Sequence, residues 1–131
     1  MNWETVKIES ENVGRKNAFA TVGRGQIVFN TTSTRQIPDI DSITCVKIMT
    51  GSEGTTKLIG FSFKKEFGEN CLAVKKRIGK HNEIASVTVS SKPLMGKLFG
   101  EVGTKQGATQ YQVVLDKGPN NEPLLVIKLE Q

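Results

Sequence analysis

The sequence has few of the side chains on which most enzyme sites depend. His81 is its only histidine, and its two cysteines, Cys45 and Cys71, are too far apart for the Cys-x-x-Cys spacing of redox and metal sites. No catalytic signature surrounds His81, which lies in a polar turn, and neither glycine-rich phosphate-loop pattern is present. We therefore expect a non-enzymatic protein with no cofactor and no metal, whose cysteines are buried free thiols.

The sequence also lacks any apolar run long enough to span a bilayer, and it opens without a basic leader or an apolar signal region. These features predict a cytoplasmic protein. Apolar residues still make up 37% of the 131 residues, which is typical of a globular chain. A chain of this length is expected to form a single domain whose core needs no disulfide.

Aromatic residues are scarce, at 6% of the chain. Four of them occupy alternating or helical positions that indicate a core: Phe29, Phe61, Phe63 and Phe99. Stacking on nucleic-acid bases needs exposed rings. The remaining candidates for stacking are Trp3, Phe19, Phe67 and Tyr111, although ordinary packing is the expected role of each.

The two halves of the chain share a pattern. Residues 46–63 align without a gap on residues 112–129, at an offset of 66, and both segments read as β-hairpins with turn-rich loops at 51–54 and 117–121. Ile59, Phe61 and Phe63 fall on Leu125, Ile127 and Leu129, which places the same alternate positions on one face of each strand. Chance alternation in two β-rich halves is the alternative.

Upstream of each hairpin lies a second matching unit, at residues 18–30 and 72–90, that predicts two short strands around a basic, glycine-containing turn. A short helix is expected next. Thr31, Thr32 or Ser33 would cap the first, which ends before Pro38, while the second covers residues 92–99 with Pro93 in its first turn and Gly100 after its end.

Each half therefore reads β-β-α-β-β, with an extra strand at residues 3–9 and a linker at residues 64–70. The predicted fold class is α+β, mostly antiparallel, in one domain of two pseudo-repeats covering about residues 1–65 and 70–131. The terminal strands at residues 3–9 and 124–130 would leave open sheet edges, which favours a homodimer.

The segment Gly23-Arg-Gly-Gln-Ile-Val-Phe-Asn-Thr-Thr-Ser-Thr-Arg-Gln-Ile37 resembles the AbrB/SpoVT swapped-hairpin transcription regulators. That resemblance implies dimerisation through hairpins and DNA binding by basic residues. This chain departs from the family at Asn30 and the Thr-rich run after it, where proline and an Arg-rich helix are usual, and it keeps Arg35. The whole chain also resembles a group of small two-repeat proteins of bacteria and phages, which implies no function, and more loosely the whirly-type single-stranded DNA-binding folds.

Charge is unevenly distributed. The chain has 18 Lys and Arg against 13 Asp and Glu, a net charge of +5, and residues 14–37 contain no acid at all. A second basic stretch covers residues 72–105. A positive surface binds phosphates by releasing their counterions, so these stretches predict DNA or other nucleic acid as the partner. The candidate contacts are Arg15, Lys16, Arg24, Arg35, Lys75, Lys76, Arg77, Lys80, Lys92 and Lys97.

Two other function classes stay open on the sequence alone. In a protein-interaction module, or a phage assembly or accessory module, the sheets would form the partner surface and the charge would only aid solubility. A small-ligand binder is the third possibility.

Overall fold

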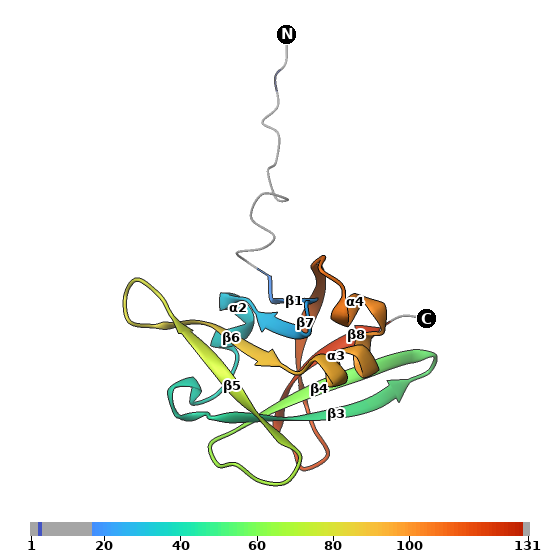
Figure 1. Cartoon of the computed structure of the whole chain (residues 1–131). Helices are drawn as coiled ribbons and strands as arrows, with labels where there is room; N and C mark the ends of the chain where they lie inside the picture. Colours follow the sequence, from blue (N-terminus) through green and yellow to red (C-terminus); the bar gives the residue numbers. More distant parts are fainter. Residues whose placement is uncertain (1–2, 4–16, 130–131) are drawn as a thin grey trace.

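Figure 1 shows a computed structural model of the chain, which describes residue 3 and residues 17–129. Eight strands form a closed barrel. They are β1 (Phe19–Gly23), β2 (Gln26–Phe29), β3 (Cys45–Glu53), β4 (Thr56–Lys64), β5 (Cys71–Ile78), β6 (Ile84–Ser90), β7 (Thr109–Lys117) and β8 (Pro123–Leu129). The helical segments are short: α2 (Thr31–Arg35), η2 (Ile40–Ser42), α3 (Lys92–Phe99) and α4 (Glu101–Thr104).

Hairpins from the two halves alternate around the barrel. The strand order is β1-β2-β6-β5-β3-β4-β8-β7, with β7 returning to β1, and every neighbouring pair is antiparallel. If β1 is exchanged with β5, β2 with β6, β3 with β7 and β4 with β8, the same pairs of strands remain neighbours. Each hairpin therefore has a strand of the other half on both sides, so the described barrel closes only when both halves are present.

The predicted mostly antiparallel, β-rich class with short helices is confirmed. Along the chain, the described elements run β1, β2, α2, η2, β3, β4, and then β5, β6, α3, α4, β7, β8. The predicted helix at 92–99 is also confirmed: the Ser91 hydroxyl caps it, proline lies in its first turn, and Gly100 follows it with φ +66°.

The predicted cap of the first helix is wrong, because Asn30 takes this role. Its side-chain oxygen accepts hydrogen bonds from the backbone N–H groups of Ser33 at 2.9 Å and Phe19 at 3.1 Å. Its amide nitrogen donates to the Asn17 carbonyl at 2.9 Å. An amide side chain can cap the helix and hold the start of β1 together, whereas a hydroxyl is too short to serve both.

Alternating strand residues fill the barrel, and the helices add to its core. Phe29 and Phe61 are fully buried and meet edge to face, with ring centroids 5.0 Å apart. Met95 of α3 is fully buried in the same cluster. The expected core positions of the four phenylalanines are confirmed, since Phe99 is also buried and Phe63 packs against the cluster.

Barrel closure overturns the predicted edge at residues 124–130. β8 pairs with β4 at residues 125–129 and with β7 at residues 123–127, so most of the predicted edge is occupied within the barrel. The strand predicted at residues 3–9 lies outside the described residues, apart from Trp3, whose side chain is 87% exposed. Packing, the role expected of Trp3, is therefore wrong. The pairing of β8 therefore removes one of the two open sheet edges on which the expected homodimer was based.

The first predicted hairpin loop is displaced along the chain. Gly51 and Ser52 still pair with Leu58 and Lys57, and the turn falls at residues 54–55, where Gly54 has φ +62°.

The thiols of the two cysteines are free as expected, but only Cys45 is buried and Cys71 is half-buried. No helix within the described residues is long and apolar enough to cross a membrane.

Candidate nucleic-acid interface

One side of the barrel wall carries no acidic residue. Strands β1, β2, β5 and β6, together with residues 109–113 of β7, contain neither Asp nor Glu. Inward positions such as Val22 and Val87 are fully buried, so the alternate residues point outward. The strand registers align five of these outward residues in one row: Gln110, Thr21, Val28, Thr88 and Lys75.

We call the outer surface of these strands the carboxylate-free face. Beside the row, Gln26 pairs with Ser90, and Ser86 pairs with Arg77. Hydroxyl and amide groups donate hydrogen bonds to phosphate oxygens, and lysine and arginine add charge. A face with donors and cations but no carboxylate is suited to a polyanion.

Arg24 lies at one end of this face, in the tight turn between β1 and β2. Its φ is +57°, and its N–H donates to the Lys105 carbonyl at 2.9 Å. Its side-chain Nε donates to the Gln106 carbonyl at 3.0 Å, which fixes the guanidinium at the surface. Arg24, Lys92, Thr104 and Gln106 line one open hollow, which we call the Arg24 corner.

Backbone contacts attach this corner to the rest of the face. The Gly25 N–H donates to the Gly103 carbonyl at 2.8 Å, and the Ser91 N–H donates to the Gly25 carbonyl at 2.9 Å. The second bond joins the end of β6 to the β1–β2 turn, so Lys92 lies beside it. The lining of the corner contains no acid.

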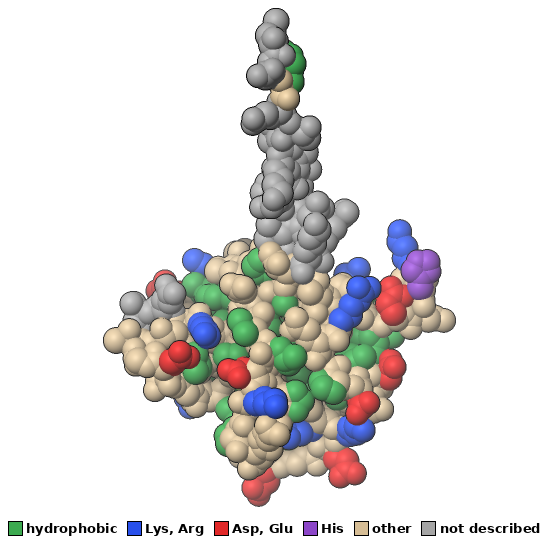
Figure 2. All heavy atoms as spheres, turned by 180° about the vertical axis from the view of Figure 1, so that it is seen from behind, with side chains coloured by type: hydrophobic (Ala, Val, Ile, Leu, Met, Phe, Trp, Pro, Cys, Tyr) green, Lys and Arg blue, Asp and Glu red, His purple; other side chains and the backbone are tan. Residues whose placement is uncertain are grey.

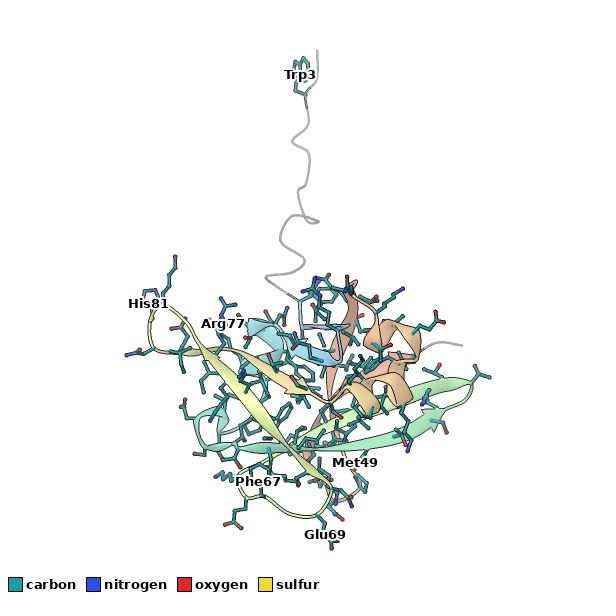
Figure 3. All side chains as sticks on the ribbon, in the orientation of Figure 1. Trp3, Met49, Phe67, Glu69, Arg77 and His81 are labelled. Carbon is teal, nitrogen blue, oxygen red and sulfur yellow. The ribbon has the colours of Figure 1, made fainter. Side chains whose placement is uncertain are left out.

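The second basic turn differs from the prediction. Arg77 lies within β5, opposite Ser86, and the turn itself contains Lys80 and His81, both exposed at the tip of the β5–β6 hairpin (Figure 3). Glu83 accepts a hydrogen bond from the His81 N–H at 2.9 Å. The turn is therefore less positive than its sequence suggests.

Arg35, at the end of α2, is exposed in a hollow that it shares with Asp41, His81 and Glu83. Two carboxylates near its guanidinium reduce the positive potential there. The two turns thus lie at opposite ends of the face, separated by β6, which is 7 residues long. At about 3.4 Å per residue the separation is roughly 20 Å.

Lys76 is occupied by the protein itself. It lies on the inward side of β5, and its ammonium donates to the carbonyls of Ile43 at 2.8 Å, Asp41 at 3.1 Å and Ile40 at 3.5 Å. Lys76 therefore attaches β5 to the segment around η2. The neighbouring Lys75 points outward and is exposed.

The other predicted contacts are dispersed. Lys97 of α3 lines a different groove, with Lys47 of β3. Arg15 and Lys16 lie outside the described residues. Of the predicted set, the structure places Arg24, Lys75, Arg77, Lys80 and Lys92 on or at the ends of the carboxylate-free face, and Lys80 shares its turn with Glu83.

The sequence reasoning missed the neutral donors of this face, such as Thr21, Thr88 and Gln110. They carry no charge, but Ser86, Thr88 and Ser90 alternate with buried valines, a signal that could have found them. Phe67 is 61% exposed, so its expected packing is wrong, and it lies on the loop before β5 (Figure 3). Phe19 and Tyr111 are half-buried, and Tyr111 packs on Phe99.

Three lysines that lie away from this face have acidic partners. Lys64 of β4 donates to Glu122 at 2.9 Å, and Ser62 donates to the same oxygen at 3.2 Å. The bond from Lys64 holds the pKa of the Glu122 carboxyl below its usual value, with smaller help from Ser62 and against the effect of burial. Lys65 pairs with Asp39 and Lys128 with Glu53. Figure 2, seen from behind, shows a face on which both charges and hydrophobic side chains are interspersed.

Among the described residues, no group of three or more His, Cys, Asp and Glu is arranged to hold a metal ion. Comparison with known proteins gives no match to a family model, to a curated protein or to a solved structure.

Proposed function

We propose that the chain is a non-enzymatic nucleic-acid-binding protein that holds DNA phosphates on its carboxylate-free face. The observation that supports this most is the row from Gln110 to Lys75, in which four of five side chains are polar or basic and none is acidic. Arg77 and the Arg24 corner add cations at the two ends. Phosphate contacts from such groups position a nucleic acid without reading its sequence.

The dimensions of the face suit this role. It spans five strands, from β7 to β5, which at about 4.8 Å per strand spacing is roughly 19 Å, and β6 makes it about 20 Å long. Duplex DNA carries one charge per about 1.7 Å of axis. A segment of about six base pairs would therefore present more phosphates than the face has cations, so every cation can find a partner.

The proposal includes the two pseudo-repeats and a regulatory role. The alternating hairpins fit a molecule in which two β-β-α-β-β units interleave, as the resemblance to swapped-hairpin regulators implies. The two basic turns are not alike in charge, because no acid lines the Arg24 corner, whereas Asp41 and Glu83 line the hollow beside the second turn together with Arg35. The first turn is therefore the stronger phosphate site in this proposal.

The test is binding of fluorescein-labelled DNA, as a single strand and as a duplex, at about 20 mM salt. Arg24→Ala, and the pair Lys75→Ala and Arg77→Ala, should each weaken binding several-fold. The matched control is Lys117→Ala with Lys128→Ala, which removes equal charge from β7 and β8 and should leave affinity nearly unchanged. Loss of affinity in the control alone, or no binding by the unaltered protein, would contradict the proposal.

A protein-interaction or phage assembly module is the second candidate. The observation that favours it is the exposure of two neighbouring apolar side chains on β7, Val114 at 40% and Leu115 at 51%. Under this alternative, Leu115→Glu would abolish binding to the partner protein, and the Lys75 and Arg77 variants would have no effect on function.

A further inference from the structure

The edge of β3 is open over its second half. On the β5 side only residues Cys45–Lys47 are paired, with Cys71–Ala73. From Ile48 to Glu53, in the described part of the chain, β3 forms backbone hydrogen bonds with β4 alone. The backbone groups that point away from β4 are therefore available to another extended chain.

A groove of about 700 Å³ runs beside this edge, between β3 and α3. Its apolar lining includes the side chains of Ile48, Leu72, Leu94 and Leu98. Leu98 is 7% exposed, and the other three are half-buried. The volume lies within the range of about 300–1,000 Å³ that is typical of ligand-binding clefts.

Two exposed lysines lie on the rim, Lys47 on β3 and Lys97 on α3, and no residue that lines the groove is acidic. The only carboxylate on the open edge is Glu53, at its far end, where it faces Lys128 at 3.9 Å. Outside the groove, Glu122 lies near enough to Lys47 for this lysine to help lower the pKa of its carboxyl. Lys97 and the acid-free lining still make the groove attractive to negative charge.

We propose that this groove binds an extended acidic peptide, which adds a strand to β3. Successive side chains of a strand point to opposite faces. One set would be apolar and enter the groove against Leu94 and Leu98, while the alternate acidic set would meet Lys47 and Lys97. Backbone hydrogen bonds to β3 would supply affinity, and the groove and lysines would supply specificity. This surface is separate from the carboxylate-free face, so the inference stands or fails without the proposed function.

The test uses a labelled hexapeptide, acetyl-Glu-Val-Asp-Ile-Glu-Val-amide, with the intact protein. Binding measured by fluorescence anisotropy should weaken at least about tenfold with Lys47→Glu and Lys97→Glu together. The control pair, Lys105→Glu with Lys117→Glu, changes the net charge equally and should keep the affinity within about twofold. Circular dichroism establishes that both variants are folded.

Strand addition has its own readout. A peptide with N-methyl groups on alternate backbone nitrogens keeps its charge and should bind at least about tenfold more weakly, because it cannot donate to the edge. On binding the unmodified peptide, amide hydrogen exchange should slow within residues 48–53. The proposal is overturned if the peptide does not bind at about 1 mM, if the N-methyl peptide binds equally well, or if a dT8 oligonucleotide binds the groove more tightly through the same two lysines.

Discussion

Gly60 of β4 pairs with Val126 of β8, the residue 66 positions further along the chain. On either side of this pair, Ile59 meets Ile127 and Phe61 meets Leu125. The offset of 66 is also the one at which the two hairpin sequences align, so each strand presents equivalent residues to the other. The pairing of β4 with β8 is therefore symmetric about Gly60 and Val126: each residue of one strand faces the counterpart of a residue at the same distance on the other side of this pair.

Cleavage of the chain in the loop of residues 65–70 tests how far each half depends on the other. Separate fragments should not fold, because each hairpin would lose its neighbours on both sides. Mixed in equal amounts, they should recover the circular dichroism spectrum and cooperative unfolding of the intact protein. A fragment that folds alone as a monomer would show that the halves are independent domains.

Adjacent lysines of β5 should behave in opposite ways. Lys76→Ala should lower the free energy of unfolding by about 1–3 kcal/mol, because it leaves the carbonyls of Ile43 and Asp41 without their donor. Lys75→Ala should change stability by less than about 0.5 kcal/mol but should reduce DNA affinity. Urea unfolding and DNA anisotropy on both variants check this contrast, and the reverse assignment would contradict it.

The Glu122 carboxyl should make stability depend on pH. Its pKa is held below the ordinary value of about 4.3, so its contribution is present above that pH and is lost as pH falls through the folded-state pKa. Glu122→Gln should cost about 1 kcal/mol at pH 7, a modest value since Lys64 is 39% exposed. The difference from the unaltered protein should shrink towards pH 3. Urea unfolding at both pH values measures it, and a difference that does not depend on pH would rule out the ion pair as its cause.

Much of the local structure could be predicted from the sequence. Helix α3 follows from Pro93 in its first turn and Gly100 after its end, and the inward faces of β4 and β8 follow from alternation at Ile59, Phe61 and their counterparts. These signals are local: a cap, a fixed φ or a period of two. Closure of the barrel depends instead on which distant strands pair, as β1 does with β7, and no local pattern specifies that.

The candidate site shows the same limit. Charge counting identified Lys75 and Lys76 equally, but strand alternation places one outward and the other towards three carbonyls. Charge counting also included Arg35 among the candidate phosphate contacts. Asp41 and Glu83 share a hollow with Arg35 only because η2 and the β5–β6 turn fold beside α2, which the sequence does not indicate. Neutral donors such as Thr21 and Thr88 could be recognised as candidate phosphate contacts only from the strand registers, which align them in one row.

The most direct test is the salt dependence of DNA affinity. The cations on or beside the carboxylate-free face are Arg24, Lys75, Arg77, Lys80 and Lys92, of which Lys80 shares its turn with Glu83. With about four effective phosphate contacts, log K against log salt for duplex DNA should have a slope of about −3 to −4. Lys75→Ala with Arg77→Ala should make that slope less steep by about two units, and the control pair on β7 and β8 should leave it unchanged. A slope that is the same with and without Lys75 and Arg77, or no measurable binding at about 20 mM salt, would contradict the account.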